Sequence, residues 1–231
     1  MSHPRRTGWL ALGLFLGVAT GGSAHAAPKV ELLDAGSFLL NMPVDREQWS
    51  VEVDAPRQWI TLRFLQSGPI RLGSVASYHV FAERVDPPAD RAKLAEFFGA
   101  YLKRKDTPLI REVFRGTRTF RADPKQHAIG EDSALLRFDM PKRAVMDAAV
   151  GGSTGYVEHA VVFIYIPPGF SAHGSFVTFV GVERINPSLG HKSRLTLVES
   201  MLRSFQWRGT VSSSATGVGV ETDAHQLLDP G

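Results

Sequence analysis

The chain has 231 residues, of which 43% are hydrophobic and 21% are charged, with 26 Lys and Arg against 23 Asp and Glu. It contains no cysteine, which excludes thiol catalysis, thiolate metal sites, disulfides and an acylated N-terminal cysteine. Its charges nearly balance once the N-terminal segment described next is removed, which argues against general nucleic-acid binding.

The first 26 residues have the three parts of a secretory signal peptide. Arg5 and Arg6 give a positive start, an apolar run follows from Trp9 to Ala19, and Ala24-His25-Ala26 is an A-x-A cleavage motif. The apolar run is shorter than the roughly 20 residues of a membrane-spanning helix. We therefore predict a signal peptide over residues 1–26 and a mature chain with 24 basic and 23 acidic residues in the bacterial periplasm, or secreted.

Strand patterns dominate the chain between Phe38 and Val85. The predicted strands are FLLNMP, WSVEV, WITLRFL and SYHVFAERV. In the third, Ile60, Leu62 and Phe64 alternate with polar or smaller residues, which is the period of two of a half-buried strand.

A change of period after Val85 predicts a helix in DPPADRAKLAEFFGAYLKRKD, with Asp86 as N-cap and Pro108 as its limit. The residues of its apolar stripe, at helical spacing, are Leu94, Phe97, Phe98, Tyr101 and Leu102. The stripe indicates that one side of this helix packs on a sheet.

A second run of strands is predicted in LIREVFRGTRTF, ALLRFDM, YVEHAVVFIYIP and SFVTFVGVERIN. The third of these is apolar on both faces from Val161 to Ile166, which is typical of a central strand covered on both sides. A last helix is predicted from the spacing of Leu195, Val198, Leu202 and Phe205, and Thr196 with Glu199 matches a capping box.

Two runs of strands, each followed by a helix, predict one α+β domain over residues 27–208, with an antiparallel β-sheet and helices packed on it. From residue 209 to 231, ten of 23 residues are Gly, Ser or Thr. We predict that this C-terminal tail is disordered.

The stretch Gly151 to Gly155, GGSTG, has the G-x-S-x-G spacing of a hydrolase nucleophile. A nucleophile elbow needs a helix after the serine, and the segment that follows here is β-branched and aromatic. We therefore interpret GGSTG as a flexible turn between two strands. The alternative is a periplasmic serine hydrolase that uses Ser153 with His173 or His191.

The stretch from Lys103 to Lys125 carries eight basic and three acidic residues. We predict a partner-binding or anion-binding site there, and its candidate residues are Arg111, Arg115, Arg118 and Arg121. Arg111, Arg115 and Arg121 share one face if the stretch is a strand. The alternative is a solvated edge strand whose charges prevent aggregation.

No metal site, cofactor or catalytic residue is predicted. The six histidines that remain after cleavage show no H-x-H, H-x-x-x-H or H-E-x-x-H spacing. Scattered surface or hydrogen-bonded histidines explain this pattern.

The opening GSFLLNMPVDREQWSVEV and the closing RLTLVESMLRSFQW, with Leu202-Arg203-Ser204-Phe205 near its end, resemble the PsbP-like proteins over Ala35 to Arg208. This group includes the Ran-binding Mog proteins and the lipoprotein DcrB. The resemblance implies an α/β/α sandwich and a binding or accessory role, and it carries no catalytic residues. Because the chain has no cysteine that could be acylated, membrane tethering like that of the lipoprotein DcrB is in doubt.

Taken together, these observations predict an exported, non-catalytic binding or accessory protein of the bacterial cell envelope, with an unknown envelope protein, a small ligand or an anionic surface as its partner. A purely structural envelope protein is the second alternative.

Overall fold

The structure, a computed structural model, describes residues 30–43, 48–64, 76–114, 118–122, 127–128, 132–147, 152–190 and 192–209. The predicted signal peptide, and the predicted tail after residue 209, lie outside these residues.

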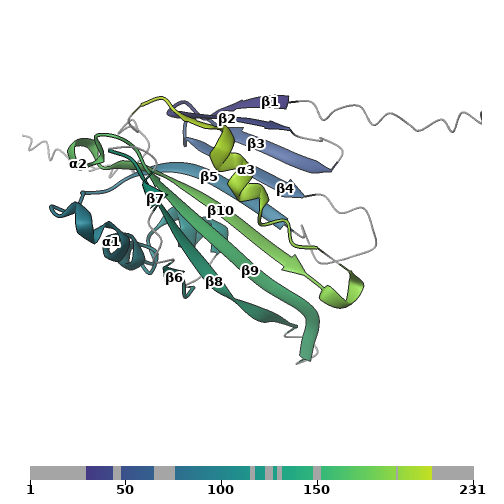
Figure 1. The fold of residues 1–231 in the computed structure, drawn as a ribbon. Coiled ribbons are helices and arrows are strands. Elements are labelled where there is room, and N and C mark those ends of the chain that lie inside the picture. The colour runs from purple at the N-terminus through teal and green to yellow at the C-terminus, as the bar shows by residue number, and fades with distance from the viewer. Residues whose placement is uncertain are drawn as a thin grey trace, which may run out of the picture.

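An eight-stranded antiparallel sheet is the centre of the fold, with the strand order β3-β4-β5-β10-β9-β8-β6, and β7 also pairs with β8 (Figure 1). The strands are β3 (Trp49–Asp54), β4 (Trp59–Phe64), β5 (Ala76–Arg84), β6 (Arg121–Ala122), β7 (His127–Ala128), β8 (Ala134–Asp147), β9 (Gly152–Ile166) and β10 (Ser175–Ile185). The pairing of β5 with β10 joins the two runs of strands that the sequence predicts, so both runs share one sheet.

A second, three-stranded sheet contains β1 (Val30–Asp34), β2 (Phe38–Pro43) and β11 (Phe205–Trp207), with β2 in the middle. Only β2 is predicted from the sequence. Phe205 is predicted as part of the last helix, but it pairs with Leu40 as the first residue of a strand. A three-residue strand has too short a pattern to be recognised, and it forms here because β2 offers a free edge.

The helices lie on opposite faces of the large sheet (Figure 1). They are α1 (Leu94–Tyr101), α2 (Phe170–His173) and α3 (Leu197–Ser204), with 3-10 turns at Arg91–Lys93 and Pro187–Leu189 and a π-helix at Leu109–Phe114. We call the face under α1, α2 and the π-helix the α1 face, and the face under α3 and the small sheet the α3 face. This arrangement confirms the predicted α+β fold with helices packed on an antiparallel sheet.

Alternation along the strands fills the two cores. On β9, Val161 and Phe163 belong to the α3-face core, whereas Val162 and Ile164 belong to the α1-face core. The prediction of a central strand covered on both sides is therefore confirmed. The alternation of Ile60, Leu62 and Phe64 is confirmed too, because all three are buried on the α3 face.

The predicted helix starts later than expected. Asp90, and not Asp86, caps the 3-10 turn Arg91–Lys93 that leads into α1, since the Asp90 side chain accepts a hydrogen bond from the amide of Ala92 at 2.9 Å. Asp86 instead lines a cleft. The predicted capping box of the last helix is wrong as well, because Thr196 has helical backbone angles and its side chain makes no capping bond.

The stretch LIREVFRGTRTF is not the strand that its sequence predicts. Residues Leu109–Phe114 form a π-helix whose first turn is closed by bonds from the amides of Ile110 and Arg111 to the carbonyl of Thr107. Thr107 followed by Pro108 is a start signal for a helical turn, although Pro108 is predicted only as the end of the preceding helix. The residues Leu109, Ile110 and Phe114 are buried in the α1-face core, and this packing determines the conformation.

Gly152 to Gly155 of the GGSTG stretch do not form the predicted turn, and Gly151 lies outside the described residues. Gly152 to Gly155 belong to β9, which pairs with β8 across two register irregularities, the second between Ala144 and Met146. Gly155 has φ +74 near this irregularity, a conformation that glycine adopts without steric cost. The connection between the two strands therefore falls before Gly152.

Candidate functional site

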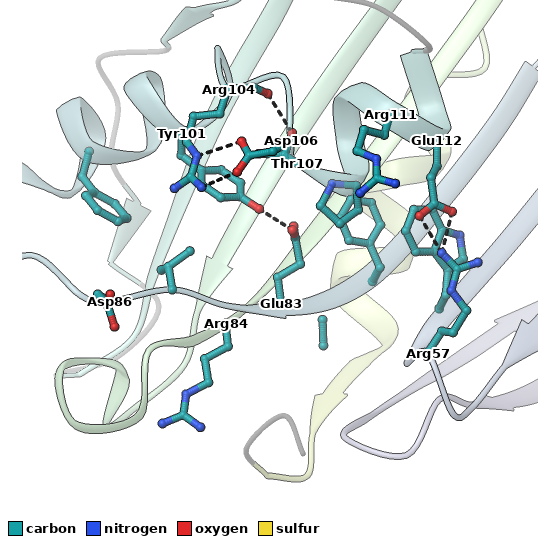
Figure 2. A pocket seen from close by; sticks show the side chains of 16 residues that line it. Arg57, Glu83, Arg84, Asp86, Tyr101, Arg104, Asp106, Thr107, Arg111 and Glu112 are labelled. Carbon is teal, nitrogen blue, oxygen red and sulfur yellow. Dashed lines mark hydrogen bonds and ion pairs between the residues drawn. The ribbon is translucent and has the colours of Figure 1, made fainter. Parts of the chain in front are cut away.

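A cleft of about 890 Å³ opens on the α1 side of the molecule. It lies between the end of β5, the last turn of α1, the π-helix and the turn that joins β3 to β4 (Figure 2). Its charged lining residues are Arg57, Glu83, Arg84, Asp86, Arg104, Asp106, Arg111 and Glu112, and its aromatic ones are Trp59, Phe81, Phe97 and Tyr101. Cations, acids and aromatic rings together suit a ligand with both charged and apolar parts.

The aromatic wall of the cleft comes from two neighbouring strands. Trp59 on β4 stacks on Phe81 of β5, with ring centroids 4.2 Å apart and planes inclined by 9°. The guanidinium of Arg57 lies 5.3 Å from the centroid of the Trp59 ring. Phe97, which the sequence places in the buried stripe of the helix, is only half-buried and faces the cleft.

Glu83, on β5, lies at the cleft and points toward α1 (Figure 2). The hydroxyl of Tyr101 donates to one carboxylate oxygen, and the hydroxyl of Thr178 donates to the other at 3.2 Å. Among the described residues no cation forms an ion pair with it. Burial raises the pKa of Glu83 to about 7, although the two hydroxyls and the charge of Arg104 act in the opposite direction.

Two of the arginines at the cleft are already engaged by acids. Arg57 donates to both oxygens of Glu112 at 2.5 and 2.6 Å, and the pKa of Arg57 is raised, chiefly by this hydrogen bond. Arg104 donates to both oxygens of Asp106 at 2.6 and 3.0 Å. The Arg57–Glu112 pair links the turn between β3 and β4 to the π-helix, whereas the Arg104–Asp106 pair lies within the segment that follows α1.

Arg111 differs from these two arginines. It is exposed, it lines the cleft from the π-helix, and it forms no ion pair with the described part of the chain. Figure 2 shows its guanidinium between the Arg104–Asp106 pair and the Arg57–Glu112 pair. Its position leaves several N–H groups for a bound acidic group.

The three of the four predicted arginines that the structure describes do not form one face. Arg111 is at the cleft, Arg115 lies outside the described residues, and Arg121 on β6 stands opposite Asp139 of β8. Arg118 lies beside Glu158 of β9. The predicted shared face is therefore wrong, because it assumed a continuous strand where a π-helix occurs.

Arg118 takes part in a group of charges that the sequence did not indicate. Glu158, whose side chain is 3% exposed, is contacted by Arg143 at 2.8 Å, Arg184 at 2.9 Å and Arg118 at 3.7 Å. We call these four residues the Glu158 cluster. Arg143 and Arg184 flank Glu158 on the neighbouring strands β8 and β10, in register with it.

The charge state of Glu158 follows from its partners. Burial acts to raise the pKa of Glu158, but the hydrogen bond from Arg184 and the charges of Arg143, Arg184 and Arg118 outweigh burial. The pKa therefore lies below its usual value, and Glu158 is ionised at neutral pH.

The geometry contradicts a hydrolase built on Ser153 and His173. Ser153 is followed by strand up to Ile166 and not by the helix that a nucleophile elbow needs. His173 lies beyond the other end of β9, and 13 residues of strand span about 43 Å. Its ring is also engaged, since Nδ1 accepts from the amide of Ser175 at 2.9 Å and Nε2 donates to the carbonyl of Pro168 at 3.0 Å. His191, the other candidate, lies outside the described residues.

A second arrangement of serine, histidine and acid also fails as a catalytic triad. The Ser193 hydroxyl donates to Glu183 at 2.8 Å, and His159 Nδ1 lies 3.9 Å from the same carboxylate. A triad needs the serine bonded to the imidazole, which is not the case here. Glu183 also accepts from the amide of Arg194 at 2.9 Å, so it holds the segment that leads into α3.

The described residues contain no group of three or more His, Asp or Glu side chains placed to hold a metal ion. None of the helices that they form is long and apolar enough to cross a membrane.

Comparison with known proteins gives matches among solved structures alone, since no family model and no curated protein sequence matches the chain. A mutant of protein Mog1 has 10% identity over 78% of this chain and 95% of that chain, with a TM-score of 0.43. The Ran-binding protein Mog1p of Saccharomyces cerevisiae has 11% identity over 78% and 96%, with a TM-score of 0.42.

Cyanobacterial PsbP (CyanoP) from Synechocystis has 16% identity over 82% of this chain and 98% of that chain, with a TM-score of 0.39. These matches confirm the predicted resemblance to PsbP-like and Mog-like proteins. At such identities and TM-scores the likeness carries no argument about function, which must come from the site itself.

Proposed function

We propose that this chain is an exported, non-catalytic binding or accessory protein of the bacterial cell envelope, and that its cleft binds an acidic group of a ligand or partner protein. The observation that carries the proposal is Arg111, an exposed guanidinium at the cleft with no ion pair among the described residues. Export rests on the signal-peptide pattern of residues 1–26.

The surroundings of Arg111 favour an anion. Arg57 and Arg104 are neutralised by bidentate acids, so they shape the cleft without competing for the ligand. Glu83 is ionised only in part near pH 7, because its pKa is about 7, and it therefore repels an anion less than an ordinary carboxylate does. A guanidinium recognises carboxylate and phosphate groups through paired N–H donors.

Photocrosslinking in the producing bacterium tests the cleft. Benzoylphenylalanine at position 97 replaces one half-buried aromatic ring of the cleft by another, and at position 142 it replaces the exposed Lys142 of β8, which does not line the cleft. We expect a crosslinked product at position 97 that is absent at position 142.

Charge reversal makes the test specific to Arg111. Arg111→Glu is expected to abolish the product formed at position 97, whereas Arg203→Glu, on the exposed side of α3, leaves it unchanged. Identical products at both positions, or a product indifferent to Arg111→Glu, contradict the proposed site. A complete lack of crosslinks at position 97 favours the purely structural alternative.

Export is tested separately by cell fractionation and N-terminal sequencing. We expect the mature chain in the periplasm or the medium, beginning at Ala27. A full-length chain that stays in the cytoplasm contradicts the assignment.

A further inference from the structure

The Glu158 cluster carries more positive charge than its structural role requires. Three guanidiniums lie within 3.7 Å of one carboxylate, so the four residues of the cluster together carry a net charge of +2. We propose that the cluster is a second binding site, which takes a phosphate monoester or inorganic phosphate through the outer nitrogens of Arg143 and Arg184.

Glu158 uses only part of the hydrogen-bond donors of Arg143 and Arg184. Glu158 Oε1 accepts from Nε and Nη2 of Arg143, and Oε2 accepts from Nε of Arg184. Nη1 of Arg143 and both Nη atoms of Arg184 have no partner in the described part of the chain. The two side chains are 50% and 56% exposed, so a ligand reaches them from solvent.

Glu158 preorganises these donors. It is 3% exposed and fixed in a central strand, so it holds both guanidiniums on one face of the sheet without the entropy cost of ordering them at binding. The register irregularity between Met140 and Arg143 on β8 sets the direction of the Arg143 side chain, which is a common effect of β-bulges.

The excess charge is itself unfavourable in the absence of an anion. The Arg118 side chain is 16% exposed, and its pKa is lowered by burial and by the charge of Arg143, with Arg184 adding to the repulsion. A dianion at the cluster offsets this repulsion, and phosphate fits the fork of N–H donors that each guanidinium offers.

This site is separate from the cleft. Glu83, at the cleft, is paired with Phe176 near the start of β10, and Arg184 lies eight residues further along the same strand. Eight residues of strand span about 26 Å. The inference therefore does not depend on the function proposed for the cleft.

An NMR titration with inorganic phosphate, at constant ionic strength maintained with chloride, tests the site. We expect saturable shifts of the amide signals of Arg143, Glu158 and Arg184. Arg184→Gln and Arg143→Gln are each expected to weaken binding at least tenfold, whereas Arg203→Gln, a matched loss of an exposed arginine on α3, leaves it unchanged.

Arg184→Lys keeps the positive charge but loses the paired N–H donors of the guanidinium, so this variant is expected to bind phosphate with intermediate affinity. Its amide spectrum, compared with that of the unaltered protein, shows directly whether the variant stays folded. Shifts that do not saturate, or that Arg203→Gln reduces as much as Arg184→Gln, overturn the proposal.

Sedimentation with vesicles distinguishes a lipid from a soluble source of the phosphate. Phosphatidylcholine vesicles with and without phosphatidic acid are compared. Sedimentation that needs both phosphatidic acid and Arg184 identifies a lipid headgroup, and saturable binding of free phosphate alone identifies a soluble ligand. If neither probe binds in an Arg184-dependent manner, the site does not exist.

Discussion

Two carboxylates at opposite ends of the α1-face core, Glu83 at the cleft and Glu158 in its cluster, show how neighbouring groups decide the charge of an acid that is shielded from water. Burial acts on both to raise the pKa. Glu83 has hydroxyl partners and its pKa rises to about 7, whereas Glu158 has guanidinium partners and its pKa falls below the usual value. At neutral pH, one face of one sheet therefore holds a partly protonated acid and an ionised one.

The two acids make the free energy of unfolding depend on pH in opposite directions. The pKa of Glu83 rises on folding from 4.5 to about 7, so the folded state binds more protons in this range, and the free energy of unfolding falls as pH rises through it. The pKa of Glu158 is lowered on folding, so its contribution is present above pH 4.5 and is lost as pH falls through the folded pKa.

The largest expected effect is that of Glu158→Gln. This change leaves three arginines around a neutral amide and is expected to lower the free energy of unfolding by roughly 3 kcal/mol. Urea denaturation at pH 7 measures it. The control Glu199→Gln removes a half-exposed acid from a 3.8 Å contact with Arg137 and is expected to lower the free energy of unfolding by less than about 1 kcal/mol. Equal losses in the two variants would contradict the central role of Glu158.

Glu83→Gln is expected to have the opposite sign. The amide keeps the shape of the protonated acid and cannot ionise, so at pH 8 it should stabilise the protein by roughly 1 to 3 kcal/mol. At pH 5, where Glu83 of the folded protein is already protonated, the gain should be several times smaller. Thermal unfolding at the two pH values measures this difference, and a gain of equal size at both would show that Glu83 does not titrate near pH 7.

Tyr101→Phe should have a smaller effect. It removes one of the two hydroxyl donors to Glu83. The loss is expected to lower the free energy of unfolding by about 1 kcal/mol at pH 8 and to raise the pKa of Glu83 further. A ¹³C NMR titration of the Glu83 carboxyl measures the pKa. Tyr165→Phe, on the α3 face, is the control, and a Glu83 pKa that does not move in Tyr101→Phe would refute the assigned hydrogen bond.

The smallest effect on stability is expected from Arg184→Gln. Its side chain is 56% exposed, and Arg143 and Arg118 remain beside Glu158. The free energy of unfolding should therefore fall by less than about 1 kcal/mol. Urea denaturation at low and high salt checks this value. A loss as large as that of Glu158→Gln would mean that Arg184 is needed for folding rather than for ligand binding.

Local patterns predicted the parts of the fold that depend on one segment alone. The two-sided apolar run of β9 required a covered central strand, and Leu94, Phe98, Tyr101 and Leu102 are buried as the helical stripe predicts. The density of basic residues from Lys103 to Lys125 also predicted Arg111 as a candidate residue, and Arg111 lies at the cleft. It missed Glu83 and Tyr101, since a glutamate in a predicted strand has no local sign of a hydroxyl partner from another element.

The sequence by itself therefore determined the α+β class, the main strands and the apolar faces, because hydrophobic periodicity reports burial within a segment. The tertiary structure decided the π-helix, the strands β1 and β11, and the meeting of Arg118, Arg143 and Arg184 on Glu158. These features depend on strand register and on contacts between residues far apart in the chain. Coulomb and hydrogen-bond energies depend on distances in space, which no short stretch of sequence contains.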